Sequence, residues 1–130
     1  MPFTTVRFFQ DATGKVPVLE WFIDLKHTDP LAFAKCLGKV LRLEAEGHEL
    51  RRPEADYLEG GIYELRAKKG HVNYRILYFF HGQRVAILAH ALTKKREIPP
   101  TDLTRAKERK AAFTREPTVH TYPHSFKDSL

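Results

Sequence analysis

The chain has 130 residues, of which 42% are hydrophobic and 29% charged, which suits a single domain with one core and not a disordered tail or a membrane protein. Its net charge of +6 is uneven, because residues 1–65 carry 8 basic and 11 acidic side chains whereas residues 66–130 carry 14 basic and 5 acidic. A basic half favours a polyanionic partner, most simply nucleic acid.

Several classes of protein are excluded at this stage. The single cysteine, Cys36, rules out an intrachain disulfide and a multi-cysteine zinc site, and its apolar helical surroundings favour a buried position. The sequence contains neither a GxGxxG pattern nor a phosphate loop, so a nucleotide-driven enzyme is not expected. With no signal-peptide pattern and no apolar run of about 20 residues, we expect a cytoplasmic protein without a membrane partner.

The first fifty residues predict one short strand and a helical hairpin. β-forming residues favour a strand over 5–9, and a proline at the first turn favours a helix over about 17–26. A second helix begins at Asp29 and Pro30, since the aspartate can cap free backbone N–H groups. Helical spacing continues to Gly47, which suits a C-terminal stop.

After this hairpin the pattern changes from helical to extended. Residues 53–61 are interpreted as a loop. Three β-prone runs follow, over residues 62–67, 72–80 and 84–92, and the short turns between them predict an antiparallel meander. A basic helix over about 101–113 comes next, and residues 118–130 show no period, so we expect an irregular tail there.

The predicted fold is therefore α+β, with the element order β-α-α-β-β-β-α. A small antiparallel sheet packs one face against the N-terminal helical hairpin, because the strands cannot bury two apolar faces unaided. The opposite face would be partly open. Residues 1–117 form the expected domain, and residues 118–130 form the irregular C-terminal tail.

Cations on neighbouring strands are the first candidates for a functional site. Alternation puts Arg66 on one face with Glu64, and the turn at 68–71 brings Arg66 and Arg75 together. The third strand ends in Lys94, Lys95 and Arg96. Such a cluster can neutralise RNA phosphates or stabilise a phosphorane-like transition state. The alternative is a solvated surface on which Arg66 only pairs with Glu64 or Glu97, which contributes little to stability.

Three pieces of this region resemble the RelE/ParE toxin superfamily, specifically its HigB-like, phage-derived branch: GIYELR at 61–66, YRILYF at 74–79 and HALTKK at 90–95. The helical hairpin and the basic helix agree with the family's order, so the resemblance covers about residues 3–115. It implies a RelE-like fold and the toxin of a type II toxin–antitoxin system. Many relatives cut mRNA, commonly on the ribosome, without a metal or an organic cofactor.

The resemblance also implies partners and roles. The usual antitoxin is a small helix-turn-helix protein that represses the shared operon, so operator DNA would be contacted only through the antitoxin. The family's phosphate-binding arginine corresponds to Arg75, its preceding strand-end arginine to Arg66, and its basic pair to Lys94–Lys95 or Lys95–Arg96. We therefore expect a catalytic set of Arg66, Arg75, Lys95 and His71, and RNA-binding residues Lys68, Lys69, Lys94 and Arg96.

His71 belongs to this set because metal-free RNA cleavage needs a base for the 2′-hydroxyl and an acid for the leaving oxygen, and a histidine suits either role. His71 precedes the strand of Arg75, and His90 is the second choice. Lysines that some relatives carry are replaced here by Ile62 and Glu64, and no tyrosine closely follows Arg96.

No metal site is expected. His120 and His124 are four residues apart, but Pro123 lies between them and a third ligand is not evident. Two other functions stay open: a non-nucleolytic, protein-binding toxin like the superfamily members that poison DNA gyrase, and a degenerate member kept as a binding module.

Overall fold

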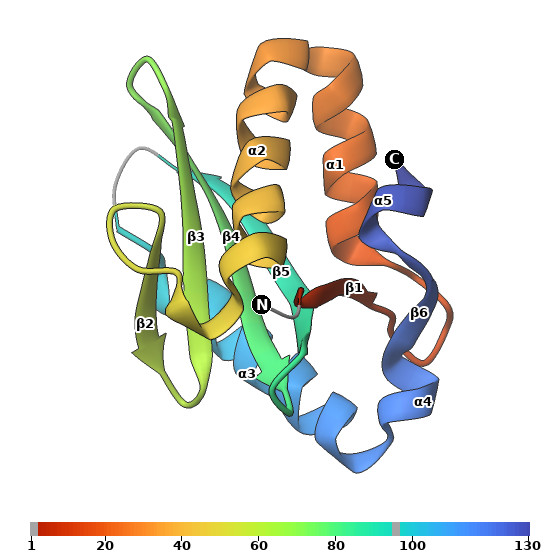
Figure 1. Ribbon diagram of the computed structural model, residues 1–130. Helices are drawn as coiled ribbons and strands as arrows, with labels where there is room; N and C mark the ends of the chain where they lie inside the picture. The colour runs from red at the N-terminus through yellow and green to blue at the C-terminus, as the bar shows by residue number, and fades with distance from the viewer. Residues whose placement is uncertain (1–2, 95–96) are drawn as a thin grey trace.

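The computed structural model describes residues 3–94 and 97–130. Its elements, in chain order, are β1 (Thr5–Phe9), α1 (Pro17–Thr28), α2 (Pro30–Glu46), the short 3-10 helix η1 (Gly47–Glu49), β2 (Ala55–Glu59), β3 (Ile62–Lys69), β4 (Val72–His81), β5 (Val85–Lys94), α3 (Pro100–Arg115), α4 (Pro117–His120), β6 (Thr121–Ser125) and α5 (Phe126–Ser129). The strands form one sheet in the order β2-β3-β4-β5-β1-β6 (Figure 1). The predicted α+β class is confirmed, with a topology consistent with a RelE-like fold.

The helical hairpin forms where the sequence predicts it. The Asp29 side chain accepts a hydrogen bond from the Ala32 N–H at 3.1 Å and so caps α2. Helix α1 runs on to Thr28, so Asp29 alone joins the two helices. Helix α2 ends at Gly47, whose φ of +52° is a left-handed value that favours glycine.

Helices cover both faces of the sheet. Helices α1 and α2 lie side by side on one face, and α3 lies on the other (Figure 1). Buried residues of the hairpin-side core include Phe8, Phe22, Val40, Leu43, Leu65, Ile76 and Tyr78. Cys36 belongs to the same core, as the sequence predicts, and burial raises the pKa of its thiol to about 12, which disfavours the reactive thiolate. On the opposite face, α3 buries Ala106 and Phe113, which leaves that face less open than predicted.

The prediction of a loop over residues 53–61 is wrong. Residues 55–59 form β2, which pairs antiparallel with β3 and makes one edge of the sheet. Gly60 and Gly61 form the connecting turn, with φ of +61° and +79°. Adjacent glycines at positive φ are typical of tight β-hairpins. The meander therefore has four strands rather than three.

The C-terminal segment also differs from the prediction, because it is regular rather than irregular. Strand β6 pairs antiparallel with β1 and forms the other edge of the sheet, while α5 places Phe126 in the core. The Phe126 ring centroid lies 5.5 Å from that of Phe8 and 5.4 Å from that of Phe22. His120 is also buried, where its Nδ1 lies 2.8 Å from the Gln10 carbonyl oxygen. One buried phenylalanine in a short segment produces no period, which is why sequence patterning misses it.

Gly47→Ala tests the helix stop. A Cβ on Gly47 would overlap the Thr4 hydroxyl and would occupy a left-handed backbone position, so we expect the free energy of unfolding to fall by about 1–3 kcal/mol. The matched control is Gly38→Ala within α2, where an added Cβ meets nothing within 4 Å and should stabilise by about 0.5–1 kcal/mol. Urea denaturation of both variants measures the difference, and equal effects would contradict the assignment.

Phe126→Ala tests whether residues 118–130 belong to the domain. The side chain is fully buried, so its removal should lower the free energy of unfolding by about 3–5 kcal/mol. The control is Val119→Ala, because Val119 is 42% exposed in the same segment. A loss below about 1 kcal/mol for Phe126→Ala would show that the segment docks only loosely in solution.

Candidate nucleic-acid interface

Arg66 and Arg75 face each other across the β3–β4 ladder. The two residues are direct cross-strand partners, which confirms the predicted convergence. Their side chains differ in exposure, at 39% for Arg66 and 16% for Arg75. The next rows toward the hairpin turn are Ala67–Tyr74 and Lys68–Asn73.

A buried carboxylate holds both arginines. Glu64 accepts a hydrogen bond from Arg66 Nε at 2.7 Å and another from Arg75 Nη1 at 3.2 Å, and its side chain is only 2% exposed. A buried charge is costly unless it is paired and hydrogen-bonded, and the two guanidinium groups meet that need. The Arg66–Glu64 pair considered as an alternative is therefore present, and it extends to Arg75.

Strand β2 lengthens this arrangement. Asp56 lies 3.1 Å from Arg66 Nη2 and 2.7 Å from Arg52 Nη2. The hydrogen bond from Arg52 is the main reason why the pKa of Asp56 lies below its usual value. Arg52, Asp56, Arg66, Glu64 and Arg75 thus form what we call the arginine–carboxylate chain, in which three cations alternate with two carboxylates. The sequence pattern does not predict its Arg52–Asp56 end, because it predicts a loop where β2 lies.

Arg75 has a buried donor atom without a partner in the described parts of the chain. Its Nε is buried and has no hydrogen-bond partner among the described residues. The residue also lines an open hollow with Glu97, Ile98, Pro99 and Pro100, between β4 and the start of α3. An unpaired buried N–H costs free energy, and a ligand oxygen would recover that cost only by entering the space that now closes Nε off from solvent. Guanidinium groups suit phosphate oxygens because they donate several hydrogen bonds in one plane.

The predicted basic residues at the ends of the strands fall into three groups. Lys68 is exposed, and it lies opposite Asn73 in the β3–β4 ladder. Asn73 lies in turn opposite Lys94 in the β4–β5 ladder, so the backbone of Lys94 is two rows from Arg75. Lys69 instead binds Asp29, with Nζ–Oδ distances of 2.7 and 2.9 Å, and ties the β3–β4 hairpin to the start of α2. Lys95 and Arg96 lie outside the described residues.

His71 is not placed beside Arg66. It lies in the exposed turn that connects Lys69 to Val72, which form the last paired row of the two strands. That row is three rows from the Arg66–Arg75 row, a distance of about 10 Å along the strands. Among the hydrogen bonds and ion pairs of residues 3–94 and 97–130, none joins His71 to either arginine. Its role in catalysis stays a prediction.

His90 is fixed between β5 and α3. Its Nε2 lies 2.5 Å from Asp102 Oδ1, and its Nδ1 lies 3.2 Å from Arg109 Nη1. Because Arg109 can only donate, we assign Nδ1 as the acceptor and place the proton on Nε2. Burial lowers the pKa of His90, and the neighbouring Arg109 charge adds to the effect while Asp102 opposes it. His90 therefore attaches α3 to the sheet as a neutral imidazole.

Within the described parts of the chain, no group of three or more His, Cys, Asp or Glu residues gathers as a metal site. His120 stacks on Phe9, with ring centroids 5.2 Å apart, and His124 lies instead against Tyr122, with ring centroids 5.3 Å apart. Among the same residues, no helix is long and apolar enough to cross a membrane.

The sequence of this chain matches a known protein family. A family model described as "Phage derived protein Gp49-like (DUF891)" matches residues 23–111. No curated protein matches the chain. The matched segment contains the whole arginine–carboxylate chain and His90, together with strands β2 to β5.

The His90 attachment predicts a pH dependence of stability. The pKa of His90 is lower in the folded than in the unfolded chain, so the unfolded chain binds more protons between the two values. The stabilisation by neutral His90 is complete above the unfolded value of about 6.5 and is lost as the pH falls through the folded value. We expect His90→Gln to flatten the dependence of the unfolding free energy on pH below about 6.5.

His71→Gln is the matched control, because that imidazole lies in an exposed turn. Urea unfolding midpoints measured from about pH 5 to about pH 8 supply the comparison. If the His90→Gln curve stays parallel to that of the wild type below pH 6.5, then His90 is not the group responsible.

Proposed function

We propose a function for this chain from one premise: it belongs to the phage-derived Gp49-like family, whose model matches more than half of its length. That membership fits a HigB-like toxin. In this proposal the chain is the toxin of a type II toxin–antitoxin system within the RelE superfamily, and it cleaves mRNA on the ribosome without a metal. The observation that carries the proposal is the direct cross-strand pairing of Arg66 with Arg75.

The two arginines supply the electrostatic part of the reaction. Attack by a ribose 2′-oxygen on the adjacent phosphorus forms a new P–O bond and adds negative charge to the phosphate oxygens. The P–O5′ bond then breaks, and the 5′-oxygen takes up a proton. Guanidinium donors that are already oriented stabilise the added charge in the transition state more than the substrate's charge. Glu64 would act as a positioning residue, because it holds Arg66 and Arg75 in place.

Proton transfer falls to residues that lie farther along the sheet. His90 is committed to Asp102 and Arg109, which favours a structural role. His71 remains the proposed acid or base for an RNA that extends from the arginines along the β3–β4 hairpin. Lys68, Lys94, Lys95 and Arg96 would hold phosphates of the same RNA.

The proposed partners are those that would meet the basic Arg66–Arg75 surface. The ribosome supplies the mRNA, and a helix-turn-helix antitoxin would neutralise the toxin by covering the Arg66–Arg75 surface. Operator DNA would then be contacted only through the antitoxin.

A second candidate has a specific observation in its favour. Two of the three arginines in the arginine–carboxylate chain are balanced by Asp56 and Glu64, which reduces the charge available to a phosphate. A toxin that binds a protein target such as DNA gyrase, without cleaving RNA, needs less free charge. A degenerate member of the family would bind its antitoxin and leave growth unaffected.

Arg75→Ala tests the proposed chemistry. Induced expression with mapping of transcript 5′ ends should show new ends for the wild type, and Arg75→Ala should reduce cleavage by about 100-fold or more, because an oriented donor to the transition state is lost. Arg84→Ala is the control, since Arg84 is an exposed arginine in the β4–β5 turn.

Arg75→Lys guards against misfolding, because it keeps a positive charge beside buried Glu64. It should fold like the wild type and cleave weakly, since an ammonium lacks the planar fork of donors. Undiminished cleavage by a folded Arg75→Ala protein would refute the site. Inhibition of supercoiling with intact transcripts would favour the second candidate.

A further inference from the structure

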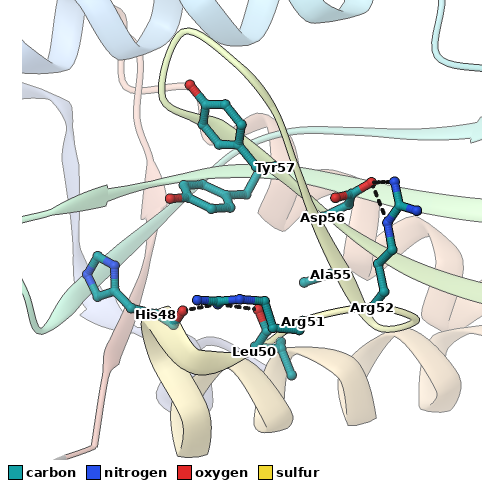
Figure 2. A pocket seen from close by; sticks show the side chains of 8 residues that line it. His48, Leu50, Arg51, Arg52, Ala55, Asp56 and Tyr57 are labelled. Atoms are coloured by element: carbon teal, nitrogen blue, oxygen red, sulfur yellow. Dashed lines mark hydrogen bonds and ion pairs between the residues drawn. The ribbon is translucent and has the colours of Figure 1, made fainter.

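A second recess lies at the β2 edge of the sheet, next to the Arg66–Arg75 row. It is a pocket of about 600 Å³ between η1, β2 and β3 (Figure 2). Its lining residues are His48, Leu50, Arg51, Arg52, Ala55, Asp56, Tyr57 and Tyr63. The combination of aromatic rings with two arginines distinguishes it from an apolar groove.

One wall of the pocket is a set of aromatic rings held in fixed positions. The ring centroids of Tyr57 and Tyr63 lie 5.0 Å apart at 72°, and Tyr63 stacks on buried Tyr78 at 5.5 Å. The Tyr57 hydroxyl accepts a hydrogen bond from the Gly61 N–H at 3.1 Å. Although Tyr57 is held at both ends, it is 52% exposed. A rigid ring that stays exposed is well suited to stacking, because little conformational freedom is lost on binding.

The opposite wall is a guanidinium group. Arg51 Nη1 donates hydrogen bonds to the backbone carbonyls of His48 and Leu50, which fixes its side chain along η1. Figure 2 shows Arg51 on the opposite side of the pocket from the two tyrosine rings, of which Tyr57 is labelled. Arg51 makes no ion pair with a carboxylate in residues 3–94 and 97–130, so its charge is available to a ligand. His48 closes one end, where its ring stacks on Phe80 at 3.6 Å.

These two walls select a planar and anionic ligand. Aromatic and guanidinium faces both stack on a nucleobase, and arginine donors bind its phosphate. A leucine or methionine side chain of a protein partner would leave the Arg51 charge buried and unpaired. We propose that this pocket binds one unpaired nucleotide of a single-stranded RNA, with its base against the exposed Tyr57 ring and its phosphate beside Arg51.

The pocket is continuous with the proposed catalytic surface. Arg52 and Asp56 line the pocket, and Asp56 also binds Arg66, which is the partner of Arg75. An RNA held at the arginines can therefore pass over the β2 edge and place a neighbouring base in the pocket. The inference rests on the proposed function for the identity of the RNA. It assigns Tyr57 and Arg51 to substrate affinity, and it assigns them no part in bond breaking.

The test measures equilibrium binding of a short, unstructured oligoribonucleotide whose 2′-O-methyl groups prevent cleavage. Tyr57→Leu should weaken binding about 5- to 100-fold, because base–aromatic stacking is lost, whereas Tyr57→Phe should bind like the wild type. Arg51→Met should weaken binding and lower the salt dependence by about one phosphate contact. Phe3→Leu is the matched control, since Phe3 is an aromatic residue that is 74% exposed outside the pocket.

Oligomers with one abasic position locate the base. At one position, removal of the base should weaken binding by the wild type about as much as Tyr57→Leu does. The same abasic oligomer should bind Tyr57→Leu no more weakly than the intact oligomer does. Equal binding of all oligomers by wild type and variant overturns the pocket inference. Weaker binding of the antitoxin by Tyr57→Leu, with RNA binding unchanged, also overturns it and assigns the pocket to a protein partner.

The two proposals fail separately. If Arg75→Ala loses transcript cleavage while folded Tyr57→Leu binds RNA like the wild type, the proposed function stands and the pocket inference is overturned. Binding of adenosine monophosphate that shifts the NMR signals of Tyr57 and Tyr63, with no cleavage by the wild type, supports the pocket and removes the ribonuclease. The absence of both nucleotide binding and RNA binding by the wild type overturns the pocket inference.

Discussion

The buried Glu64 carboxylate is the constraint on which the candidate site depends. Because its side chain is 2% exposed, it needs two partners, and Arg66 and Arg75 supply them from neighbouring strands. The same contacts limit the rotamers of both arginines, which pre-organises them for an anion. A site made of arginines without this carboxylate would lose more conformational freedom on binding a phosphate. The acid that reduces the charge of the site therefore also fixes its geometry.

The edge strand β2 extends this constraint beyond the sheet face. Asp56 lies opposite Glu64 in the β2–β3 ladder and binds Arg66, so strand pairing alone places a second carboxylate beside the first arginine. Alternation along β2 then turns Tyr57 toward the other face, where it meets Tyr63. One short strand thus contributes both to the arginine–carboxylate chain and to the aromatic pocket. This is the physical basis for treating the two surfaces as parts of one interface.

Sequence patterning predicts those parts of the fold that have strong local signals. The cap at Asp29, the stop at Gly47 and the three long strands all have such signals, and the register that pairs Arg66 with Arg75 follows from the short turn between their strands. Strand β2 was missed although Gly60–Gly61 is a hairpin signal, because its five residues alternate only weakly. The C-terminal segment was missed because β6 is specified by its pairing with β1, which is distant in sequence. The ion pairs of Glu64 depend on burial, which composition does not reveal.

The uneven charge of the sequence acquires a structural meaning. Acidic residues of the first half pair with cations of the second half: Asp29 with Lys69, Glu44 with Lys127, Asp56 with Arg66, Glu59 with Lys107, and Glu64 with Arg66 and Arg75. Five of the 14 basic side chains of residues 66–130 therefore serve contacts between the two halves, which makes them less free for a polyanion. Net charge by sequence half overstates the attractive surface. The charge count also misses donors that folding leaves unsatisfied, of which the buried Nε of Arg75 is one.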